Sequence, residues 1–306
     1  MLSRLLLLLC LGTAAGACAG GSGGDPTLGT RRVSEWAALL GSTGGEQWSA
    51  AADELSRALE SEGDRAVPAL LALLEDPRPG VRTAVDRGLR SAGPRLLPAL
   101  EAALGGGSAS TRCRVLEAIG GLHVDSPRSA RTLAGALEDR EPSVRTVAAF
   151  ALGQGTPDPE IGVPALIRAA GDPDPDVRGA SIVALGHYGP RAKPAFAALE
   201  AALADPALRR SAVESLGKLG EAGADAVPLL RAALSDRDPL VGLAAQVALG
   251  RIGPAAAPAI PELEAIVRRY ASMPGEPRVT PPAAEALRRI RGEGREPDCG
   301  HGGPPR

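Results

Sequence analysis

The sequence has 306 residues, of which 44% are hydrophobic and only 2% aromatic. It contains 34 basic and 36 acidic residues, which give a net charge of −2. The scarcity of aromatic residues argues against a large aromatic-lined pocket and leaves Ala, Leu and Val to fill the core. The near balance of charge argues against a nucleic-acid partner, because proteins that bind nucleic acid usually carry a clear basic excess.

Residues 1–17 are predicted to be an export signal. Arg4 supplies a short positive start, residues 5–11 form an apolar run, and the Ala-Gly-Ala of residues 15–17 is a small-residue cleavage site. Because the apolar run is too short to span a bilayer as a mature helix, this segment is excluded from the predicted fold. The chain is therefore expected to be exported.

Cys18 follows this signal at once, and residues 18–31 are predicted to be a flexible Gly/Ser tether. The arrangement resembles a bacterial lipoprotein, which implies lipidation of Cys18 and contact with a membrane through the lipid anchor only. Ala15 departs from that family, which usually has Leu three residues before the cysteine. The expected location is a membrane-anchored lipoprotein on the periplasmic or surface side, or a soluble periplasmic or secreted protein if Cys18 is not lipidated.

Residues 32–291 are predicted to form a series of helix pairs. One unit recurs six times between residues 67 and 253, at intervals of about 31–33 residues. Each helix is predicted to begin with proline, because the first helical position needs no N–H partner. The glycine of a recurring Leu-Gly dipeptide is predicted to adopt the left-handed conformation that ends a helix. The helix-opening prolines are Pro68, Pro98, Pro164, Pro194, Pro228 and Pro258. We therefore expect an all-α fold, an α-solenoid of about seven or eight helix pairs.

Both ends of this array are predicted to be caps. A weaker unit around Trp48 and residues 51–55 precedes the first clear copy. At the other end, a helix running towards Tyr270 is separated by a Pro/Gly-rich insertion from a last helix at about residues 283–291. Residues 292–306 are predicted to be a disordered tail.

Two rows of charged residues follow the repeat. Asp residues predicted to cap helices lie at the turn inside each unit, and an Arg lies two positions into each second helix. The rows are Asp76, Asp139, Asp172, Asp205 and Asp236, and Arg82, Arg145, Arg178 and Arg210. They predict either a ladder of ion pairs, each worth about 0–1 kcal/mol if exposed, or a row of Arg residues that binds a ligand. Gly242 replaces the Arg of the sixth unit and interrupts the row.

These units resemble HEAT repeats, in particular the short Ala-rich HEAT-like type also found in phycobilisome lyases. The resemblance covers about residues 67–253. It implies a stack of helix pairs with an extended surface, used by scaffolds and adaptors and more rarely as a frame for enzymes. We therefore expect a non-catalytic scaffold that binds another protein. A lyase-like or enzyme-accessory protein is the alternative.

No catalytic, cofactor or metal site is expected. None of the three histidines, His123, His187 and His301, stands beside a Glu, whereas the deoxyhypusine hydroxylase family needs repeated His-Glu pairs. Cys113 is expected to be a small buried residue, and Cys299 with His301 in the tail would make only a weak metal site. The sequence also lacks a nucleophile elbow, a phosphate loop and the zinc-protease motif.

One set of residues predicts a binding surface. The residue after each Leu-Gly step should align along one edge of the stack, and these residues are Gln154, His187, Lys218 and Arg251. On the same helices, Arg145, Arg178 and Arg210 are expected to face the inner surface. The positions could simply be polar turns, or they could form a groove for an acidic partner, either a protein segment or an anionic cell-envelope polymer. The protein itself is expected to be a monomer.

Overall fold

The computed structural model describes residues 25–41, 45–105, 108–122, 126–155, 158–271 and 282–293. The predicted signal peptide lies outside these residues, as do Cys18, His123, Cys299 and His301. Apart from one short ribbon, the described chain is a succession of helices joined by turns. It forms two compact units, of which the first ends at Ala151 and the second begins at Leu152.

The first unit contains antiparallel helix pairs joined by short turns or 3-10 segments. Its elements after the ribbon are α2 (Val33–Leu40), α3 (Glu46–Glu62), η1 (Gly63–Ala66), α4 (Val67–Leu74), α5 (Pro79–Ala92), η2 (Gly93–Leu96), α6 (Leu97–Leu104), α7 (Ala109–Gly121), α8 (Pro127–Ala136) and α9 (Pro142–Gly155). The boundary between the two units falls inside α9, one turn before its end.

The second unit continues the same pattern. Its elements are α10 (Pro159–Ala169), α11 (Pro175–His187), η3 (Gly189–Ala195), α12 (Phe196–Ala202), α13 (Arg209–Lys218), η4 (Gly220–Ala226), α14 (Val227–Ala233), α15 (Pro239–Ile252), η5 (Gly253–Ala259), α16 (Ile260–Ala271) and α17 (Pro282–Ile290). The predicted C-terminal cap is confirmed, since α16 reaches Tyr270 and α17 follows the insertion.

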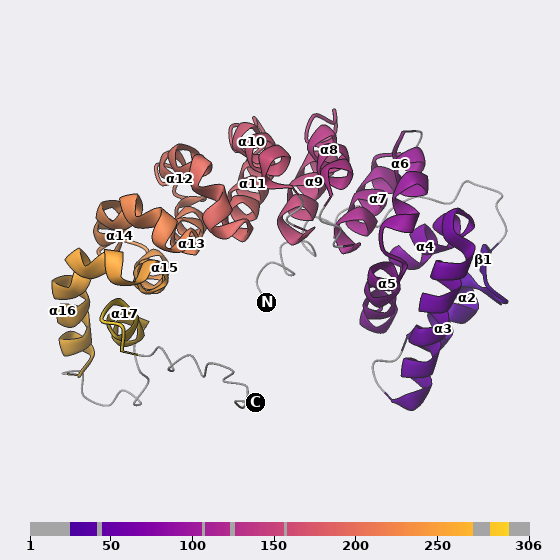
Figure 1. The fold of residues 1–306 in the computed structure, drawn as a ribbon, viewed down its shortest axis with the longest axis horizontal. Helices are drawn as coiled ribbons and strands as arrows, with labels where there is room; N and C mark the ends of the chain where they lie inside the picture. The colour runs from indigo at the N-terminus through magenta and orange to yellow at the C-terminus, as the bar shows by residue number, and fades with distance from the viewer. Residues whose placement is uncertain are drawn as a thin grey trace, which may run out of the picture. The chain divides into compact units, whose positions relative to one another are not determined.

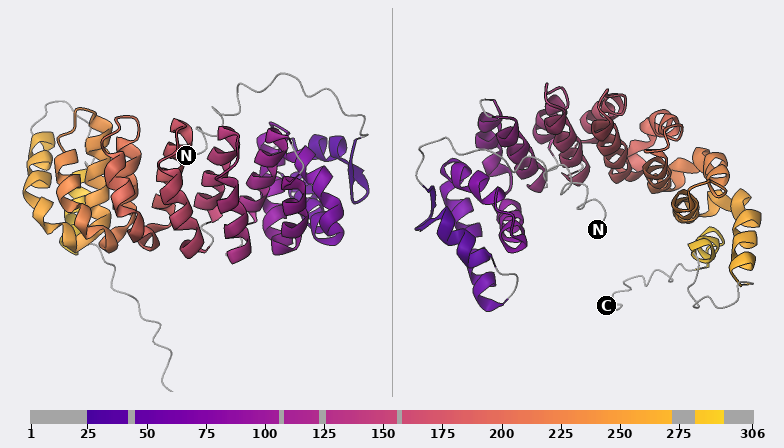
Figure 2. Two further views of the ribbon diagram at one scale, coloured as in Figure 1. Left: turned by 90° about the horizontal axis from the view of Figure 1, so that it is seen from above. Right: turned by 180° about the vertical axis from the view of Figure 1, so that it is seen from behind.

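In each unit the even-numbered helices form one layer and the odd-numbered helices a second (Figures 1 and 2). Odd-numbered helices pack on one another within each unit, as α3, α5 and α7 do in the first and α11, α13, α15 and α17 do in the second. The described residues contain eight pairs, from α2–α3 to α16–α17. The predicted all-α solenoid is therefore confirmed.

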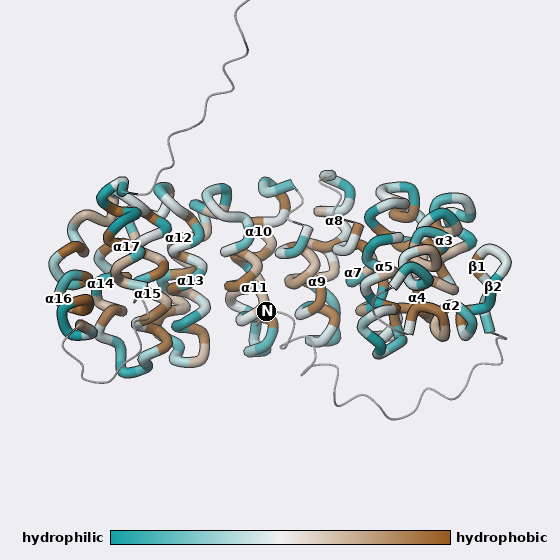
Figure 3. The backbone as a smooth tube through the Cα atoms, turned by 90° about the horizontal axis from the view of Figure 1, so that it is seen from below, coloured by the Kyte–Doolittle hydropathy of each residue, from teal (hydrophilic) through white to brown (hydrophobic). Residues whose placement is uncertain are grey.

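The core of the described residues is made mainly of Ala, Leu and Val, and Trp36 and Tyr188 are its largest buried side chains. Figure 3 shows apolar positions recurring along the helices of both units and hydrophilic ones at the turns. At the predicted N-terminal cap, Ala51, Ala52 and Leu55 of α3 are buried against the rest of the first unit, as the repeat pattern requires. Each helix is short, so its stability depends on this burial.

Proline opens several helices as predicted, but the helix around Pro164 begins earlier. Of the predicted prolines, Pro68, Pro98 and Pro228 occupy the second positions of α4, α6 and α14, whereas Pro194 and Pro258 lie inside η3 and η5. By contrast, α10 starts at Pro159 after the capping Asp158, which leaves Pro164 inside the helix. Three of the six predicted prolines therefore lie in the first turn of an α-helix, where the missing N–H group costs no hydrogen bond.

The prediction that the Leu-Gly glycines end helices is wrong. Gly153, Gly186 and Gly217 lie within their helices, where they are buried or face a neighbouring helix. The glycines that adopt the left-handed conformation come three residues later, at Gly189 and Gly220, with φ of 58° and 59°. A glycine three residues after Leu-Gly therefore ends the helix.

The tether predicted for residues 18–31 ends earlier than expected. β1 (Thr27–Leu28) pairs antiparallel with β2 (Arg31–Arg32), and Leu28 is fully buried. The indole N–H of Trp36 donates to the carbonyl of Leu28 at 3.0 Å, and Arg31 pairs with Glu54 at 3.2 Å. These contacts fix residues 25–32 against the first helix pair, so the ribbon belongs to the cap.

One described segment, Pro239–Ala271, is long and apolar enough to cross a membrane by length and composition, but 56% of its apolar window is buried inside the protein. The segment is also not a single helix, because α15 ends at Ile252 and Gly253 adopts a φ of 76° before η5. Its apolar residues build the last two helix pairs.

Candidate functional site

The predicted Asp row lies at the turns, but its members do not cap the second helix. In five turns the Oδ1 atom of the Asp accepts a hydrogen bond from the backbone N–H two residues later, at 2.8–2.9 Å. The five are Asp76, Asp139, Asp172, Asp205 and Asp236. This Asx turn orients the chain before the helix begins. Capping comes instead from residues such as Asp174, which accepts from the N–H groups of Asp176 and Val177.

The second carboxylate oxygen of three of these Asp residues meets an Arg from the preceding helix pair. The pairs are Arg112–Asp139 at 2.7 Å, Arg178–Asp205 at 3.8 Å and Arg209–Asp236 at 3.2 Å. Of these three pairs, Arg178–Asp205 joins members of both predicted rows, whereas Arg112 and Arg209 were not in the predicted Arg row. Each one links neighbouring repeats through the turn that its Asp shapes.

Arg209 takes the place that the sequence predicted for Arg210. Arg209 follows Asp205 by four residues, whereas the equivalent Arg follows its Asp by six in other units. This shorter turn places Leu208-Arg209 where the other units have Val-Arg. Arg210 lies one position further along α13 and pairs with Glu214 of the same helix at 3.7 Å.

The Arg side chains of this ladder also hold their own turns. Arg178 donates through Nη1 to the carbonyl oxygens of Asp172 and Pro173, both at 3.0 Å. Arg145 donates in the same way to two carbonyl oxygens of its turn at 2.9 and 3.3 Å. Arg145 and Arg178 are thus structural clamps, and the donors that hold the turn are not free for a partner.

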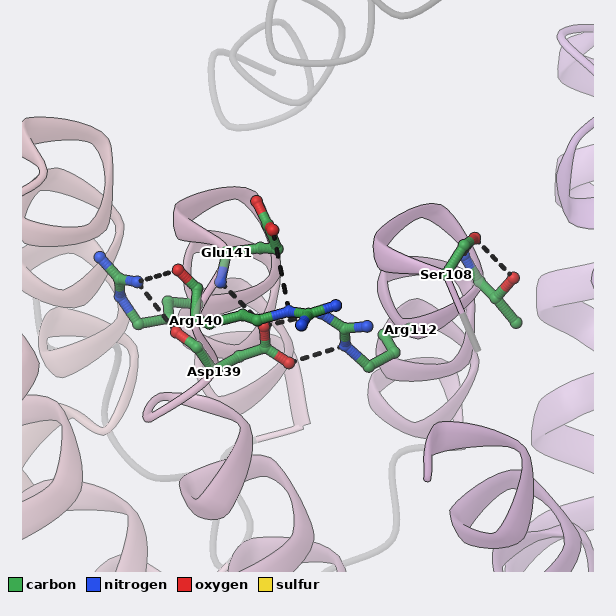
Figure 4. Close-up of polar contacts among 7 residues, drawn as sticks. Ser108, Arg112, Asp139, Arg140 and Glu141 are labelled. Carbon is green, nitrogen blue, oxygen red and sulfur yellow. Dashed lines mark hydrogen bonds and ion pairs between the residues drawn. The ribbon is translucent and has the colours of Figure 1, made fainter. Parts of the chain in front are cut away.

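The tightest pair of the ladder is shown in Figure 4. Arg112 donates through Nε and Nη2 to the two carboxylate oxygens of Asp139, at 2.7 and 2.8 Å. The hydrogen bonds from Arg112 lower the pKa of Asp139 below its usual value, against the opposing effect of burial. The two side chains are 12% and 15% exposed, so water weakens this pair less than an exposed one.

The second unit brings the predicted edge residues together. We call Gln154, His187, Lys218 and Arg251 the ridge. Each follows a helix glycine that contacts the next odd-numbered helix. A Cβ atom added to Gly186 would lie 3.0 Å from the Cα of Ser215, and one added to Gly217 would lie 2.5 Å from the Cα of Ala248. The ridge residues therefore sit beside the closest approaches between neighbouring helices.

Like charges adjoin along this ridge. Burial and then the neighbouring Lys218 lower the pKa of His187, while the Gly153 carbonyl opposes the change. Burial and Arg251 also lower the pKa of Lys218, and Glu214 opposes them. Glu214, which pairs with Arg210 at 3.7 Å, is the carboxylate whose charge acts on Lys218. At neutral pH the ridge therefore presents two adjacent cations, Lys218 and Arg251, beside a neutral His187, and a bound anion would relieve the repulsion between the two.

A second surface was missed from the sequence. Leu240, Leu243 and Val247 lie along one face of α15, in line with Arg251, and we call these three residues the α15 stripe. Leu240 and Val247 are 52% and 39% exposed, which makes them two of the few large apolar side chains on the described surface. The sequence could have indicated this surface, because residues 239–250 include no charged residue.

No group of three or more His, Cys, Asp or Glu residues placed to hold a metal ion occurs among the described residues. Cys113 is a buried free thiol, as expected, and burial raises its pKa. The described part of the chain thus offers ion pairs, a ridge and an apolar stripe as its chemical features.

Comparison with solved structures places the fold among repeat proteins. A chain of the structure of Kap95p with RanGDP matches at 15% identity and a TM-score of 0.56, covering 84% of this chain and 42% of that one. An engineered protein matches at 21% identity and a TM-score of 0.47, covering 84% and 78%. The Escherichia coli protein YibA matches at 18% and 0.46, covering 84% and 92%. The first of these likenesses supports the fold alone.

Among curated proteins none matches the sequence. A family model described as HEAT repeats matches residues 130–207 and 196–287, which together make up more than half of the chain. The match agrees with the two-layer stack of helix pairs and with the Asp turns and Arg clamps that join them. The chain belongs to the HEAT repeat proteins.

Proposed function

We propose that this HEAT repeat protein is a non-catalytic scaffold that binds an acidic protein partner along the ridge. The observation that carries the proposal is the pair of neighbouring cations Lys218 and Arg251 beside His187, whose like charges Glu214 offsets only in part. Holding like charges together costs free energy in the unbound protein. Binding to a partner that brings carboxylates would recover that cost.

The Arg row is not part of this site. Arg145 and Arg178 hold their own turns, and Arg210 pairs with Glu214, so each already has a structural contact. In the structure of Kap95p with RanGDP, one protein binds another, which is the kind of activity proposed here for a stack of the same fold. Among the ridge residues, His187 bonds to the carbonyl of Gly153, whereas Lys218 and Arg251 lie next to each other as like charges.

We also propose that the scaffold is exported and anchored to a bacterial envelope through a lipid on Cys18. The support is sequence alone: an apolar run, a small-residue cleavage site and a cysteine before a glycine-rich stretch. Metabolic labelling with an alkynyl fatty acid should label the wild-type protein and not the Cys18→Ala variant. An unlabelled wild type that is recovered free of membrane would contradict the anchor.

Binding is tested by capture after mild cross-linking in the native cells. The ridge variant carries Lys218→Glu and Arg251→Glu. Its matched control carries Arg168→Glu and Arg237→Glu, two exposed cations near the start of their turns and away from the ridge. We expect an acidic protein to be captured by the wild type and by the control, and lost from the ridge variant.

Both variants should retain the far-ultraviolet circular dichroism of the wild type, because all four side chains are at least partly exposed. If the ridge variant captured the same partner as strongly as the wild type does, the proposal would be contradicted. So would capture of a partner whose contact region is basic.

A further inference from the structure

The α15 stripe occurs where the sixth repeat departs from the pattern of the others. Leu243 stands at the position that Arg210 has in α13. Gly242 stands at the position that Arg178 has in α11, where the Arg side chain bonds to its own turn. Two positions that carry charge elsewhere are therefore apolar or without a side chain in α15, and Leu240 is left 52% exposed.

The helices on both sides of the stripe carry ion pairs. Glu214 of α13 and Glu285 of α17 occupy the positions equivalent to Val247. Each is paired within its own helix, Glu214 with Arg210 at 3.7 Å and Glu285 with Arg289 at 2.8 Å. Because α15 packs on both α13 and α17, the stripe lies between two charged helices. A partner that covers it needs a narrow apolar face with polar flanks, which is the pattern of an amphipathic helix.

The steps along the stripe match those of an α-helix. Leu243 lies about 4.5 Å along the axis from Leu240, and Val247 lies about 6 Å further, since each residue of an α-helix rises about 1.5 Å. A partner helix with apolar residues three and four positions apart repeats both steps, so its side chains can pack between those of the stripe. Three side chains on one face of a β-strand cover about 13 Å, whereas the stripe covers about 10.5 Å.

The cations at one end of the stripe set the direction of that helix. Arg251 lies one turn beyond Val247, and Lys218 of α13 adjoins Arg251. The first turn of a helix favours acidic side chains, because its free N–H groups carry partial positive charge. A partner helix antiparallel to α15 therefore brings an acidic first turn to Lys218 and Arg251. A parallel partner would bring its last turn there, where acidic side chains are unfavourable.

We propose that the α15 stripe binds an amphipathic α-helix of another protein, antiparallel to α15 and with acidic residues in its first turn. The apolar face of this helix packs on Leu240, Leu243 and Val247, and its first-turn carboxylates face Lys218 and Arg251. Charge complementarity with these two cations and the continuity of the stripe with the ridge identify the occupant. This inference rests on the proposed function and names the form of its acidic partner.

The test uses the full chain and three 16-residue peptides of one composition, each with three Leu and two Glu, and follows binding by fluorescence anisotropy. The acid-first peptide has Glu in the first turn and Leu at positions 5, 9 and 12. The acid-last peptide has Glu in the last turn instead, and the alternating peptide has Glu in the first turn and Leu at every second position. We expect the acid-first peptide to bind about ten-fold more tightly than either of the others, because only it makes both contacts.

The cationic contact is tested with the Lys218→Glu, Arg251→Glu variant. This variant should lose the preference for the acid-first over the acid-last peptide, whereas Arg168→Glu, Arg237→Glu should keep it. The comparison also corrects for helix content, because a preference that came from the helicity of the peptides alone would be the same in both variants.

The apolar contact is tested with Leu240→Ser and Val247→Ser together. Binding of the acid-first peptide should weaken about ten-fold, since these side chains are 52% and 39% exposed in the unbound protein and become buried in the complex. The matched control is Leu39→Ser in α2 of the first unit, a side chain that is 41% exposed, and it should bind as the wild type does. Equal affinities of the wild type and the stripe variant would overturn the inference.

Other outcomes separate this inference from the proposed function. Tighter binding of the alternating peptide would overturn it in favour of an extended partner. Binding that is lost in the ridge variant but unchanged in the stripe variant would overturn it while the acidic-partner proposal stands. Peptide binding that the ridge variant retains in full would contradict both proposals.

Two outcomes would show that the chain itself occupies the stripe, and either would overturn the inference. One is a wild type that light scattering shows to be a dimer and that the stripe variant converts to a monomer. The other is peptide binding that appears only after residues 294–306 are removed.

Discussion

The two units use charge in different ways. In the first unit, cations on the odd-numbered helices pair across neighbouring helices, as Arg87 of α5 does with Asp53 of α3 at 2.6 Å. In the second unit, Lys218 and Arg251 lie next to one another beside His187, and Glu214 offsets their like charges only in part. Both units therefore have ion pairs between repeats, and the second unit adds neighbouring like charges at Lys218 and Arg251.

The largest expected effect concerns the glycine contacts that both units share. Gly217→Ala should lower the free energy of unfolding of the second unit by about 1–3 kcal/mol, because the new Cβ would lie 2.5 Å from the Cα of Ala248. Gly120→Ala in the first unit should cost less, since its Cβ would lie 3.1 Å from the Cα of Ala151. Urea titration followed by circular dichroism measures both.

The control for these variants is Gly179→Ala in α11. Its Cβ would meet only Leu208 at 3.5 Å, an ordinary contact, so the helix preference of Ala should leave stability equal or slightly higher. If all three variants behaved alike, close packing at the Leu-Gly step would not be what joins the repeats.

The next effect compares two ion pairs of the ladder. Asp139→Asn should cost about 1 kcal/mol, because Asn keeps the turn but loses the charge that faces Arg112. Asp205→Asn should cost less, since its Arg lies 3.8 Å away and both side chains are more exposed. Thermal melts at neutral pH should show the difference.

The pH dependence of Asp139→Asn follows from the lowered pKa of Asp139. An Asp whose folded pKa is depressed stabilises the fold above its unfolded pKa of about 3.9, and this stability is lost as the pH falls through the folded value. Wild type and variant should therefore converge in stability below about pH 4. A gap that persists in acid would show that the charge is not the cause.

A smaller effect should differ in sign between the units. Arg87→Gln should lower the free energy of unfolding by less than about 1 kcal/mol, because it removes a paired cation. Lys218→Gln should raise it slightly, since burial and Arg251 both disfavour the charge that it removes. High salt should reduce both effects. A loss of stability in Lys218→Gln would mean that the ridge cation is structural.

The smallest effect is the acid response of the ridge. Because the folded pKa of His187 lies below its unfolded value near 6.5, protonation favours the unfolded state, and stability should fall as the pH drops below about 6.5. His187→Gln should flatten this slope. Melting temperatures of wild type and variant at pH 7.5 and pH 5 give the comparison, and identical slopes would contradict it.

Much of the fold could be predicted because each repeat contains residues that mark where helices and turns begin and end. Proline in the first turn, Asp in the turn and the recurring Ala-Leu-Gly step predicted helix pairs and their number. The ribbon at Thr27–Leu28 and Arg31–Arg32 was missed, since strands of two residues show no periodicity. The glycine of Ala-Leu-Gly was assigned to a helix end, because sequence alone does not distinguish a left-handed glycine from one at a close helix contact.

The candidate site was predicted only in part. The ridge followed from aligning equal positions of successive repeats, and the structure places its members on neighbouring helices. Arg209 was missed because a shorter turn shifted the register, and the clamping role of Arg178 depends on backbone carbonyls that a sequence does not position. The α15 stripe required knowing which face of the helix stays exposed.

The most direct measurement is hydrogen exchange of the full chain with and without a poly-glutamate of about 20 residues, long enough to cross three helices in extended form. Protection is predicted at the C-terminal turns of α11, α13 and α15, which carry His187, Lys218 and Arg251. The equivalent turns of α5 and α7 in the first unit should exchange as before. Equal protection of both units, or protection confined to the even-numbered layer, would contradict the account.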